Sequence, residues 1–166
     1  MLPLCLHAQD ARQYLYNNAY VYQQRHSPDT ALMVLDILLR VDSTYVPAWN
    51  LKGYIHEEHF AQYDSARVCY QKALDLDPLN VKGYINMAHL HYLKREYLPA
   101  KQLLNRALEI DSTYGDTYYN LGFIANEQND RHQALVYMKK AIALGSQAAV
   151  RWMEWYEEQE RLKTEN

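Results

Sequence analysis

The sequence predicts an all-α fold of stacked helical hairpins, and three observations lead to this prediction. Of the 166 residues, 49% are apolar and only 5 are Gly and 5 are Pro, which is too apolar for a disordered chain and too poor in turn formers for an all-β fold. Small residues recur along the chain at intervals of 34 or 35 residues. Each interval contains two amphipathic helical patterns separated by a polar break.

The repeat is marked by three independent features. An alanine in the second half of each unit stands at Ala31, Ala66, Ala100 and Ala134. A small residue in the first half of each unit stands at Ala19, Gly53, Ala88 and Gly122. The tetrapeptide Asp-Ser-Thr-Tyr at 42–45 returns two periods later, at 111–114. All three give one period, whose single extra residue falls between Gly53 and Ala66, and such self-similarity is typical of a solenoid of stacked units.

Residues 1–11 form an N-terminal segment that is similar to the end of a secretory signal sequence. Leu2, Leu4 and Leu6 are apolar, and the small residue Ala8 stands where cleavage could occur, but the segment is short and lacks a basic start. A plain N-terminus and a signal-peptide remnant therefore both stay open. The first interpretation places the protein in the cytoplasm, and the second implies an exported, for example periplasmic, protein.

Two helices are predicted in each repeat, and the second repeat shows the pattern most clearly. Trp49, Gly53 and His56 recur at i, i+4 and i+7, so we expect them on the inward face of the first helix, with His56 as a packed core residue. Ala66 and Tyr70 begin the same pattern after a polar break. Small residues stand where two helices must approach closely, and large residues fill the space beside them.

Helix boundaries are indicated by capping and breaking residues. Ser27 before a proline, Asp64 and Asp130 are typical of helix starts. Pro78 and Gly145 follow the ends of apolar patterns and indicate helix stops.

Residues 149–166 are predicted to form a capping helix and a charged tail. Trp152, Met153 and Tyr156 offer apolar groups to the preceding repeat, whereas residues 157–163 are mostly charged. A terminal cover is needed because each unit of a repeat array buries its apolar face only against a neighbour.

These features resemble the tetratricopeptide repeat family. Its pattern has an aromatic, a small residue and a Tyr in the first helix, and two alanines around a large residue with a closing Pro in the second. The matching residues are Trp49, Gly53, Ala66, Tyr70, Ala73 and Pro78, then Tyr84, Met87, Ala88, Ala100, Leu104 and Ala107, then Tyr118, Leu121, Gly122, Ala134, Met138 and Ala141. The resemblance implies a right-handed superhelical solenoid with four repeats at 12–45, 46–80, 81–114 and 115–148.

Composition and motifs argue against catalysis, nucleic-acid binding and membrane insertion. The net charge is -3 with 17 scattered basic residues, whereas phosphate backbones are bound by clustered Lys and Arg. The sequence has no phosphate-binding glycine loop or nucleophile motif, and its string His56-Glu57-Glu58-His59 departs from the zinc-protease pattern. No apolar run approaches the length of about 18 residues that a membrane span needs. We therefore predict no catalytic residue, no metal site and no cofactor.

A second stripe on the first helix of each repeat carries the candidate binding site. It lies one residue past the core stripe, which rotates it by about 100° around the helix. In the tetratricopeptide fold this stripe lines a concave groove, so the resemblance implies a peptide-binding groove here. The predicted groove residues are Tyr16, Tyr20, Asn50, Tyr54, Asn86, His89, Tyr92, Tyr119, Asn120 and Phe123. The alternative is that some of these rings pack between adjacent repeats.

The residue types of this stripe suit recognition of a peptide. A tyrosine ring buries a large area at low entropic cost and keeps a hydroxyl for hydrogen bonding. An asparagine amide offers both a donor and an acceptor, which matches a peptide backbone, and the resemblance implies this use of groove asparagines. The alternative for each asparagine is a hydrogen bond within its own repeat. Acidic residues near the stripe, such as Glu58 and Asp116, disfavour an anionic ligand and favour a polar-aromatic segment with some positive charge.

The sequence therefore predicts a non-enzymatic interaction module that binds a peptide or helix of another protein. The alternative is a structural unit that forms homo-oligomers through its end helices. Trp155 and Leu162, on the C-terminal helix, motivate this alternative, and so does the imperfect first repeat, where Asn18 and Leu38 stand at sites that are normally Leu and Ala in the family.

Overall fold

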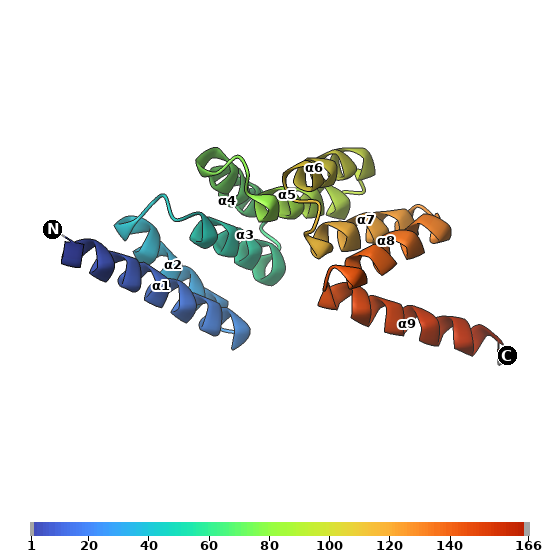
Figure 1. Ribbon diagram of the computed structural model, residues 1–166. Helices are drawn as coiled ribbons and strands as arrows, with labels where there is room; N and C mark the ends of the chain where they lie inside the picture. The colour runs from blue at the N-terminus through green and yellow to red at the C-terminus, as the bar shows by residue number, and fades with distance from the viewer. Residues whose placement is uncertain (1, 165–166) are drawn as a thin grey trace. The chain divides into compact units, whose positions relative to one another are not determined.

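The computed structural model describes residues 2–164, with the side chains of residues 11–163. This part of the chain contains helices and no strand, so the predicted all-α helical repeat fold is confirmed (Figure 1). The helices are α1 (Leu2–Gln24), α2 (Pro28–Val41), α3 (Val46–Phe60), α4 (Tyr63–Leu76), α5 (Val81–Leu93), α6 (Tyr97–Ile110), α7 (Gly115–Glu127), α8 (Arg131–Ala143) and α9 (Gln147–Thr164). Of the helices in residues 2–164, none combines the length and apolar character that a membrane span requires.

The turn inside each helical hairpin repeats one backbone conformation. A residue other than glycine adopts a left-handed conformation there, with φ values from 51° to 63°, at His26, Ala61, Arg95 and Asn129. The intervals between successive turns are 35, 34 and 34 residues. The extra residue of the repeat consequently lies before Ala61, in the last turns of α3, which has 15 residues where α5 and α7 have 13.

Helix ends follow the sequence signals closely. Asp130 caps α8, where its Oδ1 accepts a hydrogen bond of 3.0 Å from the backbone N–H of Gln133. Gly145, just past the end of α8, has a φ of 85°, a conformation that glycine adopts without steric cost. Helix α2 begins directly after Ser27, as predicted, whereas α4 begins one residue before Asp64.

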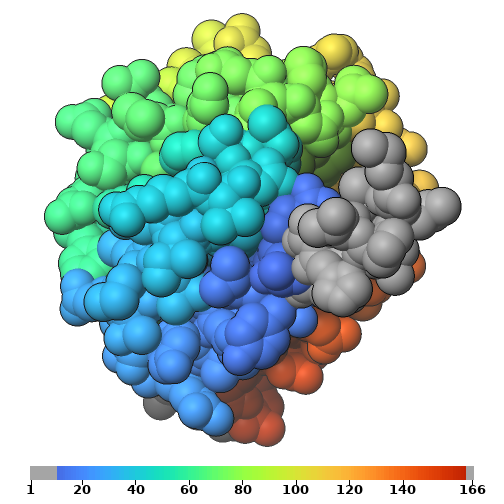
Figure 2. Space-filling model, turned by 90° about the vertical axis from the view of Figure 1, so that its left-hand side faces the viewer, coloured from blue at the N-terminus to red at the C-terminus, as the bar shows by residue number. Residues whose placement is uncertain are grey.

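The chain divides into two compact units, and the boundary falls within α5, after Asn86. In the first unit, the hairpins α1–α2 and α3–α4 are joined by contacts between α2 and α3, seen in light blue and cyan in Figure 2. The core between these hairpins is made of small and branched apolar residues. They are Ala19, Ala31, Leu35, Leu38, Leu39, Ala48, Leu51 and Ile55.

Gly53 lets α3 approach α4 closely. The ring of Tyr70, which is fully buried, fills the space beside Gly53, and a Cβ at this position would lie 2.6 Å from Tyr70 Cδ1. The Tyr70 hydroxyl donates a hydrogen bond of 2.7 Å to Oε2 of the buried Glu57. Burial, followed by the charge of the Glu57 carboxylate, raises the pKa of Tyr70.

The prediction that His56 packs in the core is wrong. His56 is half-buried, and its Nδ1 lies 2.8 Å from Oε1 of Gln62, in the turn after α3. The preceding residue, Ile55, is fully buried with Leu51 in the core of the first unit. Because α3 contacts α2 as well as α4, its buried surface is wider than the single stripe from which the prediction was made.

In the second unit, α9 packs against α7 and α8. Trp152 is buried there, as expected from the sequence, and its ring stacks on Tyr156 at 5.1 Å between centroids. The cluster that it joins contains Met138, Ala141 and Ala149.

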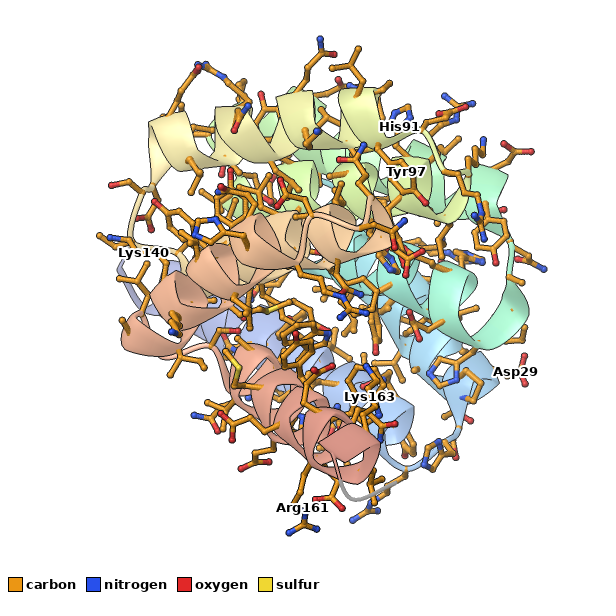
Figure 3. All side chains as sticks on the ribbon, turned by 90° about the vertical axis from the view of Figure 1, so that its right-hand side faces the viewer. Asp29, His91, Tyr97, Lys140, Arg161 and Lys163 are labelled. Carbon is orange, nitrogen blue, oxygen red and sulfur yellow. The ribbon has the colours of Figure 1, made fainter. Side chains whose placement is uncertain are left out.

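The end of α9 is charged and exposed. Two ion pairs run along the helix surface, Arg161 with Glu158 at 2.7 Å and Lys163 with Glu160 at 2.6 Å (Figure 3). Each pair joins residues three positions apart, a spacing at which opposite charges stabilise a helix.

Candidate functional site

The predicted groove residues line two separate cavities, one in each unit. Tyr16, Tyr20, Asn50, Tyr54 and Asn86 line a cleft of about 350 Å³ in the first unit, here named the N-terminal cleft. His89, Tyr92, Tyr119, Asn120 and Phe123 line a cavity of about 100 Å³ in the second unit, here named the C-terminal pocket.

The tyrosine rings of the N-terminal cleft come from α1 and α3, and the first half of α5 adds Lys82 and Asn86 to its lining. Tyr16 and Tyr20 stand one turn apart on α1, and Asn50 and Tyr54 stand one turn apart on α3, so each pair shares a helix face. The rings of Tyr20 and Tyr54 are 49% and 40% exposed. These two rings are therefore open to a ligand.

Tyr16 has a partly structural role. Its ring is half-buried and meets the ring of Tyr45 edge to face, with 5.8 Å between centroids. For this residue, the alternative that a groove ring packs between neighbouring repeats is correct in part. Burial raises the pKa of the Tyr16 hydroxyl, and the nearby Tyr45 raises it further. The hydroxyl therefore remains a proton donor at neutral pH.

Two asparagines form a fixed hydrogen-bond relay at the cleft. The backbone N–H of Gly83 donates to Asn80 Oδ1 over 2.6 Å, and Asn50 Nδ2 donates to the same oxygen over 3.0 Å. Because a backbone N–H can only donate, Asn80 must present its oxygen here, and Asn50 must present its nitrogen. The orientation of the Asn50 amide is thereby set by the backbone at the start of α5.

The relay leaves one acceptor in the cleft lining without a partner. Asn50 is 8% exposed, and its Oδ1 is shielded from solvent with no hydrogen-bond donor among the described residues. An unpaired buried polar atom of this kind costs about 1–3 kcal/mol.

The charges around the N-terminal cleft are mixed. Lys82 contributes one ammonium group to its lining. Partial burial raises the pKa of the Tyr54 hydroxyl, and the nearby carboxylates of Glu58 and Glu57 raise it further. The tyrosine hydroxyls, amides and ammonium group of this cleft can all donate hydrogen bonds, which suits binding to carbonyl oxygens.

Sequence reasoning missed several residues of this cleft. Gln23 and Gln24 continue the stripe of Tyr16 and Tyr20 by one further turn of α1, so extending the same pattern would have found them. Asn80 directly precedes α5 and bonds to an N–H in the first turn of that helix, and this is the usual position of an N-cap asparagine.

The rings of the C-terminal pocket mostly contact one another. Phe123 lies 5.6 Å from Tyr92 and 5.9 Å from Tyr119 between ring centroids, and His89 stacks on Tyr92 at 5.8 Å. Burial raises the pKa values of Tyr92 and Tyr119. In this pocket the rings therefore pack against one another, which is the alternative to ligand binding that the sequence left open.

The two other groove asparagines differ in their hydrogen bonding. Asn120 Nδ2 donates a hydrogen bond of 2.8 Å to the backbone oxygen of Asp116, one turn earlier. For Asn120, the alternative of a hydrogen bond within its own repeat is therefore correct. The side chain of Asn86 makes no hydrogen bond with the described residues and lines the N-terminal cleft. Asn86 therefore has its donor and acceptor available to a ligand.

Comparisons with known proteins agree with this architecture. A human protein named Protein O-mannosyl-transferase TMTC3 is 30% identical over 101 residues, which are 61% of this chain and 11% of that protein. The chain thus spans about a tenth of the length of this relative.

Solved structures share the fold. A structure of PilF from Pseudomonas aeruginosa superposes with a TM-score of 0.73 at 24% identity, over 83% of this chain and 63% of that chain. A crystal structure of MamA superposes with a TM-score of 0.64 at 19% identity, over 80% of this chain and 77% of that chain.

The family comparison matches three consecutive stretches of the chain. The tetratricopeptide repeat matches residues 46–78, 81–114 and 115–144, which together exceed half of the chain. These stretches contain the hairpins α3–α4, α5–α6 and α7–α8. On the repeat spacing, the hairpin geometry and these matches, the chain belongs to the tetratricopeptide repeat family.

Proposed function

We propose that the N-terminal cleft binds an extended segment of a partner protein. The repeats make the chain a protein–protein interaction module. The proposal adds to this a binding site, in which Tyr20 and Tyr54 supply the contact surface and Asn86 fixes the ligand backbone.

The Asn86 amide, which lines the cleft and makes no hydrogen bond with the described residues, is the observation that carries the proposal. A peptide backbone presents an N–H donor and a carbonyl acceptor at every residue except proline. A backbone N–H and a backbone carbonyl of such a segment can pair with the oxygen and the nitrogen of the Asn86 amide. Neighbouring carbonyl groups can accept hydrogen bonds from Lys82 and the tyrosine hydroxyls. The cleft volume of about 350 Å³ lies within the range of about 300–1,000 Å³ that ligand sites show.

The proposal assigns no chemical transformation to this chain. The name of the human relative describes a transferase, but the similarity covers 11% of that protein. We assign to the shared segment the binding role of tetratricopeptide repeats rather than a transfer reaction. The cleft lining of Tyr, Asn, Gln and Lys residues supplies hydrogen bonds and aromatic surface, which are the means of recognition.

Assembly through the end helices is the second candidate. Trp155, 55% exposed on α9, favours it. Leu162, 43% exposed near the end of the same helix, adds to it, whereas Trp152 and Tyr156 pack within the second unit. Helix α9 thus offers a second copy two exposed large apolar side chains rather than a continuous apolar face, so the partner-binding function is the stronger proposal.

Peptides selected from a random display library on the immobilised chain test the proposed site. The double variant Tyr20→Ala, Tyr54→Ala removes both open rings. Truncation of a central aromatic contact costs about 2 kcal/mol, roughly thirtyfold in affinity, so we expect the Kd of selected peptides to rise at least thirtyfold in a fluorescence-anisotropy titration.

The matched control is the double variant Tyr14→Ala, Tyr63→Ala. Both tyrosines are exposed in the same unit and neither lines the N-terminal cleft. This variant should bind like the unmodified chain. Equal peptide affinity of the cleft variant and the control, with helical circular dichroism unchanged in both, would show that the site lies elsewhere.

A further inference from the structure

The tetrapeptide Asp-Ser-Thr-Tyr occurs twice and forms the same turn in both places. The first turn (42–45) precedes α3 and the second turn (111–114) precedes α7. In the first, Asp42 Oδ1 accepts hydrogen bonds from the backbone N–H and the hydroxyl of Thr44, over 2.9 and 2.6 Å. In the second, Asp111 Oδ1 accepts the same two bonds from Thr113, over 2.8 and 2.6 Å. The two turns therefore orient the second carboxylate oxygen alike.

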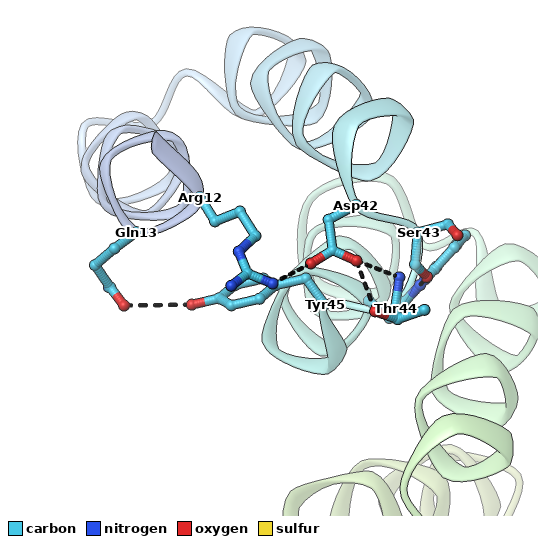
Figure 4. Close-up of polar contacts among 7 residues, drawn as sticks. Arg12, Gln13, Asp42, Ser43, Thr44 and Tyr45 are labelled. Carbon is cyan, nitrogen blue, oxygen red and sulfur yellow. Dashed lines mark hydrogen bonds and ion pairs between the residues drawn. The ribbon is translucent and has the colours of Figure 1, made fainter. Parts of the chain in front are cut away.

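The first turn holds an arginine of the chain itself. The guanidinium of Arg12, from α1, forms an ion pair with Asp42 Oδ2 (Figure 4). Its Cζ also lies 5.9 Å from the centroid of the Tyr45 ring, a cation–π distance. Gln13, the next residue of α1, accepts a hydrogen bond of 3.3 Å from the Tyr45 hydroxyl. The turn thus binds a guanidinium with its free carboxylate oxygen and its aromatic ring together.

The second turn has no such arginine. Two periods after Arg12 the sequence has the apolar residue Val81. No hydrogen-bond donor or cation of the described residues pairs with Asp111 Oδ2. The oxygen that holds Arg12 in the first turn is consequently available in the second.

An open cleft of about 340 Å³ lies at the second turn. Its lining includes Asp111, Tyr114, Asp116 and Ser146, all of which belong to the second unit. The Ser146 hydroxyl donates to Asp116 Oδ1 over 2.6 Å, which holds this second carboxylate in place. The cleft therefore presents two carboxylates, neither of which forms an ion pair within the described residues, beside a half-buried tyrosine ring.

We propose that this cleft, here named the Asp111 cleft, binds an arginine side chain of a partner protein. In this arrangement the guanidinium pairs with Asp111 Oδ2 and the Asp116 carboxylate, and its flat face lies on the Tyr114 ring. Arginine fits better than lysine because its planar group pairs with carboxylates in a forked geometry and stacks on aromatic rings. The site does not depend on the N-terminal cleft, since it uses other residues in the other unit.

A partner protein is a better source of this arginine than a second copy of the chain. Arg12, the arginine that this motif is seen to bind, already pairs with Asp42 of its own chain. The net charge of -3 also favours association with a positively charged segment of a different protein.

The test is a titration of the isotope-labelled full chain with blocked arginine, N-acetyl-arginine amide, followed by backbone amide resonances. Saturable shifts should appear at Thr113, Gly115 and Gly145. Blocked lysine should bind at least fivefold more weakly. Asp111→Asn should weaken arginine binding at least fivefold, and Asp29→Asn, the same change at an exposed acid in the first unit, should leave it unchanged.

A second variant guards against loss of the turn. Tyr114→Leu keeps an apolar side chain beside the turn but removes the aromatic face, so arginine affinity should fall about threefold towards that of lysine. The proposal is overturned if shifts do not saturate in the unmodified chain, if blocked lysine binds as tightly, or if Asp111→Asn and Tyr114→Leu both bind arginine normally. These outcomes leave the peptide site in the N-terminal cleft unaffected.

Discussion

Single side chains fix the connections between repeats, and Asp42 shows how. Its carboxylate organises its own turn through Thr44 and also pairs with Arg12 on α1, so one residue joins a turn to a helix 30 positions earlier in the chain. Hydrogen bonds from Thr44 and Arg12 lower the pKa of Asp42 from 3.8 to about 2. The charged form is therefore the one that stabilises the folded chain.

The Asp42 contribution should depend on pH. Because the folded-state pKa lies below the ordinary value, the stabilisation is complete above about pH 4 and is lost as the pH falls through about 2. Asp42→Asn should lower the free energy of unfolding at pH 7 by about 1 kcal/mol, the usual scale of a charge-assisted surface contact. Urea denaturation of both proteins measures the difference.

Asp111→Asn is the control for this prediction, because the second turn has the same Thr113 hydrogen bonds without an arginine. Its effect at pH 7 should be smaller than that of Asp42→Asn. A difference between Asp42→Asn and the unmodified chain that is as large at pH 2 as at pH 7 would contradict the assigned role of the carboxylate.

At the scale of helices, the turn within each hairpin imposes a strained conformation on an ordinary residue. Ala61 has a φ of 51°, where its Cβ crowds the following carbonyl, and its side chain is exposed. Ala61→Gly should raise the free energy of unfolding by about 0.5–1 kcal/mol, since the strain is removed and no packing is lost. Thermal and urea denaturation measure the change.

Asn129→Gly, at the equivalent turn with a φ of 63°, should raise stability by less, because asparagine adopts the left-handed region more readily than alanine. A loss of stability in Ala61→Gly would mean that the flexibility which glycine adds to the unfolded chain outweighs the strain at this turn.

The helices themselves could be predicted from the sequence because small residues recur at a fixed interval where helices cross. Gly53, for example, marks the contact of α3 with the Tyr70 ring. The wrong prediction for His56 has the opposite cause. Helix α3 packs against both α2 and α4 and so buries two faces. A single periodic stripe identifies one of these faces and does not show that Ile55 rather than His56 is buried.

For the whole molecule, the sequence predicted one aromatic groove, and its residues line two cavities of different character. Tyr20 and Tyr54 stay open in the N-terminal cleft, whereas Tyr92, Tyr119 and Phe123 contact one another in the C-terminal pocket. Periodicity places these residues on one stripe, but ring-to-ring contacts depend on side-chain conformations that the pattern does not contain. The Asn50–Asn80 relay was equally out of reach, because it joins residues 30 positions apart through a turn.

The most direct test of the proposed peptide site is photo-crosslinking. A library-selected peptide that carries benzoylphenylalanine at its central position is irradiated with the full chain, and the attachment sites are mapped by mass spectrometry. We predict attachment within reach of the N-terminal cleft, at residues such as Tyr20, Tyr54 and Lys82. Attachment confined to the exposed surfaces of α2 and α4, for example at Met33 and Val68, would contradict the account.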